Sequence, residues 1–393
     1  MSHVTTDIHD DDVREFLRDM AAEMPPYGPE PPAAVRRAKR RLVRNGVTSV
    51  IVLAAIAAGA LGATHLLDSA TRKIPVEHPT PGPQGGIATV PVGDGPSAIA
   101  FGDGAVWVAN ADDSTVSRVD PATNEVTATI EVVGGGYLEI AAGEGGIWVA
   151  SEAGAVRRID PATNEVVATI PARHPSEIIA GAGAVWVSNY DRGTVTKIDP
   201  ETNTVVDTIA VSGVDPHGLA IEGGSVWVMN DLKGSIDRID PATDAVVPAV
   251  RGVMAGQLAA GAGSVWAMGP DYTLLRIDPA NESVTSIGPV WKASDLYAVD
   301  IAATDTAVWV ATPDRTMLVD PTTNAIIGTI PQGGSVIATG AGSGWAIGGD
   351  NDPELLARLD PSAAVPTNRQ AINENPYRGG PPLPETTRDR RYA

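Results

Sequence analysis

Cysteine is absent from this 393-residue chain, and basic residues are few. The lack of thiols excludes disulfides, cysteine-ligated zinc, iron–sulfur clusters and thiol nucleophiles. Only 28 Lys and Arg residues stand against 48 Asp and Glu residues, which gives a formal net charge of −20. Because neutralising phosphates needs a basic patch, this charge argues against a nucleic-acid partner.

Familiar catalytic motifs are missing as well. The chain has no Gly-x-Ser-x-Gly elbow, no His-Glu-x-x-His pair and no phosphate-binding loop. Glycine (42 residues) and proline (32 residues) are abundant, but hydrophobic residues still make up 43% of the chain, so most of it should fold. The sequence leaves open whether the protein is an enzyme, and the missing motifs favour a non-catalytic role.

The first 46 residues join an acidic stub to a basic cluster. Residues 1–35 contain eight acids and two bases. Apolar residues recur there at the spacing of one helix face, which predicts a short amphipathic helix over residues 10–24, ended by Pro25 and Pro26. This helix is either a marginal element of a solvated stub or a docking helix for a cytosolic partner. Six cations follow between Arg36 and Arg44.

Residues 47–67 form an apolar run without Asp, Glu, Lys or Arg. At a rise of about 1.5 Å per residue, a helix of this length spans about 31 Å, close to the thickness of a bilayer core. The preceding cations place its N-terminal side in the cytoplasm by the positive-inside rule. A cleaved signal peptide is the alternative, but a 46-residue leader exceeds the usual length. We therefore expect an uncleaved signal anchor in the cell membrane.

Residues 68–85 carry four prolines, Pro75, Pro79, Pro81 and Pro83. Such a stretch favours extended conformations and predicts a semi-rigid linker. Everything that follows it should lie outside the cytoplasm, tethered by a single membrane-spanning helix.

A tryptophan-centred pattern recurs seven times after this linker. Consecutive tryptophans are 41, 38, 41, 39, 43 and 36 residues apart, and only Trp291 falls outside the series. An Asp-Pro pair follows each one, so two independent markers give the same period of about forty residues. The tryptophans are Trp107, Trp148, Trp186, Trp227, Trp266, Trp309 and Trp345, and the pairs begin at Asp120, Asp160, Asp199, Asp240, Asp278, Asp320 and Asp360.

Each repeat is expected to form four short strands. In the second repeat they would cover residues 139–142, 147–150, 155–159 and 166–170. Seven such units indicate an all-β fold, a seven-bladed β-propeller of four-stranded blades over residues 86–372. The tryptophans and the Asp-Pro turns are interpreted as packing and turn residues rather than as chemical groups.

An open β-solenoid is the alternative, but the chain carries a closing device. Residues 88–91, Ala-Thr-Val-Pro, match the fourth strands at 168–171 and 328–331. The seventh repeat lacks this element after Asp360, so the N-terminal strand should complete the seventh blade and remove the open edges. The Pro- and Arg-rich tail, residues 373–393, is expected to be disordered.

The first repeat, residues 106–130, resembles the YVTN-type repeat of bacterial surface propellers. Its segment 115–124, Thr-Val-Ser-Arg-Val-Asp-Pro-Ala-Thr-Asn, carries the likeness, and Val-Trp-Val-Ala-Asn stands where that family has Tyr-Val-Thr-Asn. The resemblance covers about 285 residues, from Ile87 onward. It implies a membrane-anchored bacterial surface propeller and says little about activity, because propellers host unrelated functions.

In a propeller the first strand of each blade lines the central channel, and loops from every blade converge at its mouth. Counting nine residues back from the tryptophans places three carboxylates and one amide there, and counting ten back adds a histidine. These groups would attract cations, and Glu139, Glu177 and Asp300 are candidate ligands for Ca²⁺ or Mg²⁺; no other cofactor is predicted. The expected ligand-binding residues are Glu139, Glu177, His217, Gln257 and Asp300.

Loops on the same face add further acids. The alternative interpretation is that all these acids are ordinary solvated charges of an acidic protein. If they do cluster, the adjacent pair Glu139 and Glu177 should show it, because a clustered pair raises the pKa of one carboxyl. The loop acids are Asp112, Asp113, Glu152, Asp191, Asp231, Asp271 and Asp314.

The motif Pro216-His217-Gly218 is similar to the blade openings of streptogramin (virginiamycin B) lyases. Those enzymes are seven-bladed propellers that use histidine and a magnesium site, and they carry such a histidine on consecutive blades. Here the preceding blade has Ser176 and the following blade has Gly256 at that position. A general acid–base elimination centred on His217 would therefore lack its partner.

Three functions remain open from the sequence. The favoured one is an extracytoplasmic binding or scaffolding module, with an unidentified ligand or protein at the acidic channel mouth. The second is a lyase-like enzyme centred on His217, and the third is a transmembrane sensor that signals through residues 10–24. The sequence does not identify the ligand, the partner or the oligomeric state.

Overall fold

The computed structural model describes residues 87–133, 136–253, 256–269, 273–290, 300–348 and 355–366. The predicted N-terminal helix, membrane-spanning segment, linker and C-terminal tail lie outside these residues. Within the described residues, no helix is long and apolar enough to cross a membrane.

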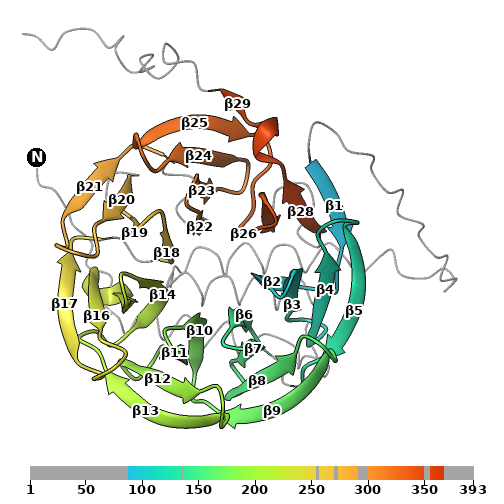
Figure 1. The fold of residues 1–393 in the computed structure, drawn as a ribbon, viewed down its shortest axis with the longest axis vertical. Helices are drawn as coiled ribbons and strands as arrows, with labels where there is room; N and C mark the ends of the chain where they lie inside the picture. The colour runs from blue at the N-terminus through green and yellow to red at the C-terminus, as the bar shows by residue number, and fades with distance from the viewer. Residues whose placement is uncertain are drawn as a thin grey trace, which may run out of the picture. The chain divides into compact units, whose positions relative to one another are not determined.

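Seven antiparallel sheets form a ring, each with its first strand at the centre and its last at the rim (Figure 1). Blade 1 comprises β2 (Pro96–Gly102), β3 (Ala105–Asn110), β4 (Thr115–Asp120) and β5 (Glu125–Glu131). Blade 2 comprises β6 (Leu138–Gly143), β7 (Gly146–Ser151), β8 (Ala155–Asp160) and β9 (Glu165–Pro171). Blade 3 comprises β10 (Pro175–Gly181), β11 (Ala184–Asn189), β12 (Thr194–Asp199) and β13 (Thr204–Ala210). Blade 4 comprises β14 (Pro216–Glu222), β15 (Ser225–Asn230), β16 (Ser235–Ile239) and β17 (Val246–Arg251).

The remaining blades follow the same plan. Blade 5 comprises β18 (Leu258–Gly261), β19 (Ser264–Met268), β20 (Leu274–Ile277) and β21 (Val284–Ile287). Blade 6 comprises β22 (Asp300–Ala303), β23 (Val308–Ala311), β24 (Thr316–Asp320) and β25 (Ala325–Ile330). Blade 7 takes β26 (Val336–Gly340), β27 (Ser343–Ile347) and β28 (Leu355–Leu359) from the end of the chain. The prediction of an all-β, seven-bladed propeller is confirmed.

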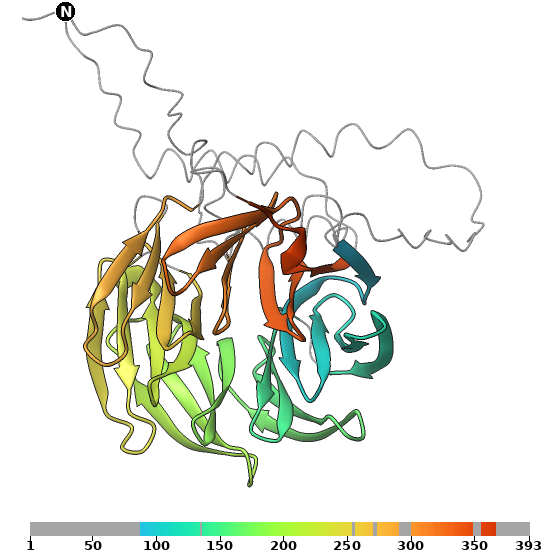
Figure 2. The same ribbon diagram turned by 45° about the horizontal axis from the view of Figure 1, so that its top comes forward.

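The N-terminal strand closes the ring, as predicted. Strand β1 (Ile87–Pro91) pairs antiparallel with β28, with Val90 opposite Leu356. Figure 2 shows β1 in blue beside the red strands of blade 7. With β1 as its outermost strand, blade 7 has the same four-stranded plan as the other blades.

The chain after Asp360 adds a strand that the sequence analysis did not expect. The short strand β29 (Val365–Pro366) pairs with β25, placing Val365 opposite Thr329, and becomes a fifth strand of blade 6. A two-residue strand has too little sequence to carry a period-two pattern, so no hydrophobic alternation could reveal it.

The repeated tryptophans are core residues. Trp107 and Trp345 are fully buried, and Trp309, the most exposed of the seven, is 3% exposed. The indole nitrogen of Trp107 donates to the carbonyl of Gly102 at 3.0 Å, and other blades repeat this bond. All seven indoles pack between sheets, six of them with this donor bonded, which confirms the packing interpretation.

The Asp-Pro turns join neighbouring blades. The Arg118 guanidinium lies 5.1 Å from the ring centre of Trp107 and donates to Pro161 O and Asn164 Oδ1 of blade 2, both at 2.9 Å. Arg358 repeats this from blade 7 to blade 1, donating to Pro121 O at 2.7 Å. We call this arrangement the interblade clasp. Its basic residues are Arg118, Arg158, Lys197, Arg238, Arg276 and Arg358.

Candidate functional site

The connections that lead into each first strand and those that follow each second strand lie on one face of the ring, as predicted. The amide of Ala111, just after β3, donates to the carbonyl of Gly95 at 2.8 Å. In blade 4 the amide of Asp231 donates to the carbonyl of Asp215 at 3.1 Å. We call this the loop face, and the opposite face, which carries the Asp-Pro turns, the turn face.

The predicted site residues lie on innermost strands at the centre of the ring. Glu139 is the second residue of β6, Glu177 the third of β10, and Asp300 the first of β22. Gln257 directly precedes β18, and His217 is the second residue of β14. Asp300 is 9% exposed, and the other four are half-buried.

Glu177 connects these residues electrostatically. Burial raises the pKa of Glu177 well above its usual range, and the nearby carboxylates of Glu139 and Asp300 raise it further. Hydrogen bonds from the backbone of Leu219 and the side chain of Gln257 oppose the shift without cancelling it. The predicted acidic cluster is therefore present, with Glu177 as the carboxyl whose pKa rises.

Two of the three carboxylates also hold adjacent blades together. Asp300 accepts the amide of Ile337 in blade 7 at 2.8 Å, and its other oxygen accepts the amide of Ile301 at 2.8 Å. The backbone of Leu219 in blade 4 stabilises the charged form of Glu177 in a similar way. Sequence reasoning missed this structural role, because it depends on how far apart neighbouring innermost strands lie.

Glu139 has a partner that sequence reasoning did not identify. The hydroxyl of Tyr137, two residues earlier, donates to Glu139 Oε1. The only signal in the sequence was an aromatic hydroxyl on the same side of the chain as the acid. This bond fixes the orientation of the Glu139 side chain beside Glu177.

Two acceptor atoms at this site have no hydrogen-bond partner. Glu177 Oε2 and Gln257 Oε1 are both buried, and neither receives a hydrogen bond. Buried polar atoms are usually bonded. Other exceptions, such as Asn110 Oδ1 and Asn230 Oδ1, lie at the ends of β3 and β15, whereas these two lie on innermost segments of blades 3 and 5.

His217 lies in a β-bulge beside these groups. The β14–β15 register runs from the pair Pro216 and Asn230 directly to Leu219 and Val228, leaving His217 and Gly218 between them. The carbonyl of His217 accepts the Ser188 hydroxyl of blade 3 at 3.0 Å. Bulges re-aim side chains and are common next to functional sites.

No metal is assigned to the channel mouth. Within the described ranges, no group of three or more His, Asp or Glu residues is arranged so that it could hold a metal ion. Glu139, Glu177 and Asp300 therefore interact through their charges but do not form such a group.

A second group of acids lies on the loop face over blades 3 and 4. Burial raises the pKa of Asp231 to about 7, with a smaller contribution from Asp215, although the amide of Gly256 donates to its carboxylate at 3.2 Å. Burial and the charge of Asp191 raise the pKa of Asp215. Sequence reasoning named Asp191 and Asp231 but missed Asp215, which precedes an innermost strand.

Three of the other described loop acids bond to neighbouring groups within their own blade. Asp113 accepts the amide of Asp94 at 2.8 Å, and Glu152 accepts that of Tyr137 at 3.3 Å. Asp314 pairs with Arg315 at 3.0 Å. For these three acids the interpretation as ordinary surface charges is adequate. Asp271 lies outside the described residues.

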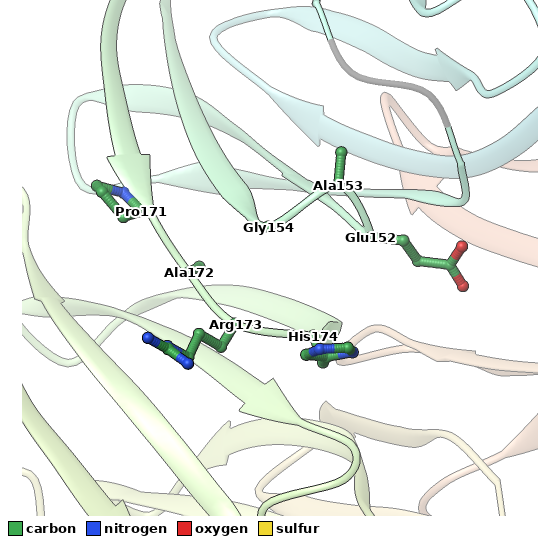
Figure 3. Close-up of a pocket in the computed structure, with 7 residues that line it drawn as sticks. All are labelled: Glu152, Ala153, Gly154, Pro171, Ala172, Arg173 and His174. Atoms are coloured by element: carbon green, nitrogen blue, oxygen red, sulfur yellow. The ribbon is translucent and has the colours of Figure 1, made fainter.

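A surface depression of about 400 Å³ opens between blades 2 and 3, lined by Glu152 to Gly154 and Pro171 to His174. In Figure 3 the side chains of Glu152 and Arg173 point in opposite directions. The depression therefore has no convergent set of polar groups, and the channel mouth remains the stronger candidate.

Residues 80–226 match a family model described as a domain of unknown function, DUF5074. The match covers less than half of the chain and names no activity. No curated protein matches the chain.

Several solved propellers are similar in fold. Streptogramin B lyase has a TM-score of 0.58 at 14% identity, covering 69% of this chain and 96% of that one. Hydrazine synthase from Kuenenia stuttgartiensis has a TM-score of 0.57 at 16% identity, covering 68% and 96%. A protein described as the extracellular domain of the one component system BT4673 from B. thetaiotaomicron has a TM-score of 0.56 at 18% identity, covering 71% of this chain but only 43% of that one. The chain is thus a seven-bladed β-propeller with four-stranded blades, similar in structure to streptogramin B lyase and to other propellers.

Proposed function

We propose that the protein is a membrane-anchored, extracytoplasmic propeller that binds a ligand or partner protein at the mouth of its channel. The observation that carries the proposal is the convergence of Glu139, Glu177 and Asp300 around two buried acceptors without partners. Burying like charges together costs folding free energy, and such clusters are concentrated at functional sites. Inter-blade hydrogen bonds alone would not require Glu177 Oε2 and Gln257 Oε1 to stay unbonded.

The anchor rests on the 47–67 apolar run and the cations before it. Because the chain has no cysteine, one introduced cysteine reports its own compartment. Asp305→Cys, at an exposed position, should react with a membrane-impermeant maleimide in intact cells, whereas Thr6→Cys should react only after lysis. The opposite labelling pattern would overturn the proposed location.

The binding role is tested with full-length protein crosslinked at the surface of intact cells. Wild type should capture a partner or ligand that Glu139→Gln/Glu177→Gln loses, while Glu125→Gln, an exposed change on the rim strand β5, keeps it. Equal capture by all three proteins would move the binding surface away from the channel mouth. Absence of any specific capture, together with no ligand-dependent rise in melting temperature, would refute the binding role.

A lyase-like activity centred on His217 is the second candidate, favoured by the bulge that presents this residue and by the fold shared with streptogramin B lyase. Ser176 occupies the position of the expected second histidine and bonds to Ser188 at 2.8 Å. Turnover of a streptogramin that survives His217→Ala unchanged would end this candidate.

A sensor role is the third candidate, since one similar propeller is described as the extracellular domain of a signalling system. In this case residues 10–24 would contact a cytosolic partner. Deletion of residues 1–30 should then abolish that interaction while leaving ligand binding outside the cell intact.

A further inference from the structure

The channel mouth contains acceptors in excess of donors. Glu177 Oε2 and Gln257 Oε1 are buried without partners, and neither atom can donate while Glu177 is ionised. Gln257 is among the groups that act on the Glu177 carboxyl, so these two acceptors, from blades 3 and 5, lie close together. A ligand that satisfies both atoms must carry at least two N–H or O–H donors.

The charges around these acceptors are negative. Glu139 on β6 and Asp300 on β22 both act on the Glu177 carboxyl, and no cation of the described chain is among the groups that shift its pKa. The strands packed against β10 carry two further titratable side chains, His217 and Glu222, both on β14, whereas β7 and β11 carry no charged residue. The ligand should therefore be positively charged as well as rich in donors.

We infer that the channel mouth binds the head group of a protonated primary amine, whose N–H groups bond Glu177 Oε2 and Gln257 Oε1, and that binding displaces a proton from Glu177. This inference rests on the proposed binding role of the channel mouth and names its ligand class. When no amine is bound, protonation of Glu177 relieves the charge repulsion, so the proton and the ammonium group compete for one carboxylate. The balance is one ammonium bound for one proton released.

The test uses full-length protein in detergent micelles and methylammonium as the probe. Tetramethylammonium, with the same charge but no N–H, is the matched control ligand at equal ionic strength. Titration calorimetry in two buffers of different ionisation heat should show about one proton released per methylammonium bound. The affinity should rise with pH wherever Glu177 is protonated in the free protein, by up to about tenfold per pH unit.

Two variants separate the acceptors from the fold. Glu177→Gln should lower methylammonium affinity at least about tenfold and abolish proton release, because a carboxamide neither ionises nor supplies the charge. Gln257→Met keeps the shape but removes one acceptor, so it should weaken binding while proton release persists. Glu125→Gln, on the rim, should bind as wild type does.

Three outcomes would overturn the inference: no binding of methylammonium, equal binding of tetramethylammonium, or binding without proton release in wild type. These failures are distinct from failure of the proposed function. If the protein captures a partner through the channel mouth but does not bind methylammonium, the proposed binding role stands and the amine ligand is rejected. Conversely, if the protein binds methylammonium but captures no partner at the cell surface, the amine site stands and the scaffolding role is rejected.

Discussion

The two faces of the ring use charge in opposite ways. On the turn face, each clasp places a basic side chain over a tryptophan, at 5.1 to 6.0 Å, and against a turn of the next blade. At the channel mouth, the charges that act on Glu177 are the carboxylates of Glu139 and Asp300, and no basic residue is among them. The first arrangement recurs at six junctions, and the second occurs once.

This difference separates structural from candidate functional residues. A contact that recurs blade after blade contributes to the stability of the ring, whichever ligand is present. Glu177 occupies the position where blade 1 has Ala98. A polar residue that occurs at this position in only some blades is not needed to form a blade. Variants on the turn face should therefore change stability, and variants at the channel mouth should change how stability and binding depend on pH.

The largest effect is expected from Trp148→Ala. The indole is fully buried between sheets and donates to Gly143 at 3.0 Å, so truncation removes packing and a hydrogen bond together. We expect a loss of about 3–5 kcal/mol in the free energy of unfolding, measured by urea denaturation. A loss below about 1 kcal/mol would show that the blades hold together without the tryptophan ring.

The next effect concerns a single clasp. Arg118→Leu removes two charge-assisted bonds to blade 2 and the stacking on Trp107, and should cost about 2 kcal/mol in urea denaturation. The junction between blades 6 and 7 is the natural control. There Leu318 replaces the basic residue and is 3% exposed, packed with Trp309, so a polar clasp is exchanged for apolar contact. No stability loss in Arg118→Leu would mean that apolar contact alone suffices at every junction.

The fold could be predicted almost completely from the sequence, because seven copies of Trp and Asp-Pro over-determine the period. The closing strand was also predictable, since residues 88–91 repeat the fourth-strand pattern. The clasp was not predicted, although its signal is present: a basic residue stands two positions before the Asp of six Asp-Pro pairs. Linking that residue to the turn of the next blade requires the distance between blades, which the sequence does not contain.

The site was predictable in position but not in chemistry. Counting back from the tryptophans found Glu139, Glu177 and Asp300 because each first strand has a fixed offset from the second. The effect of Gln257 on Glu177 reaches from blade 5 to blade 3, so it depends on the curvature of the ring. Asp215 escaped notice because loop lengths vary and place it outside the counted positions.

At the channel mouth we expect a gain of stability. Glu177→Gln can keep the bond to Leu219, and its new NH₂ group can donate to Gln257 Oε1. Because the pKa of Glu177 is higher in the folded than in the unfolded protein, the wild type loses stability as the pH rises above about 4.5, its unfolded value. At neutral pH the variant should be more stable by at least about 1 kcal/mol, and the gain should vanish below about pH 4. Urea denaturation across this range measures it, and a gain independent of pH would contradict the shifted titration.

The smallest effect should come from Asp231→Asn, on the loop face outside the channel. The pKa of Asp231 is raised from 3.8 to about 7, mainly by burial, so the folded protein holds a proton that the unfolded protein has lost between these values. Wild-type stability should therefore fall as the pH rises from about 4 to about 7, and the asparagine variant should lack this part of the slope. Since Asp231 is only partly buried, solvent screening should limit the difference to about 1 kcal/mol. If Asp231→Asn and Glu177→Gln change the pH dependence of stability equally, the loop face and the channel mouth titrate as one acidic region. A smaller change in Asp231→Asn would show that the two regions titrate separately.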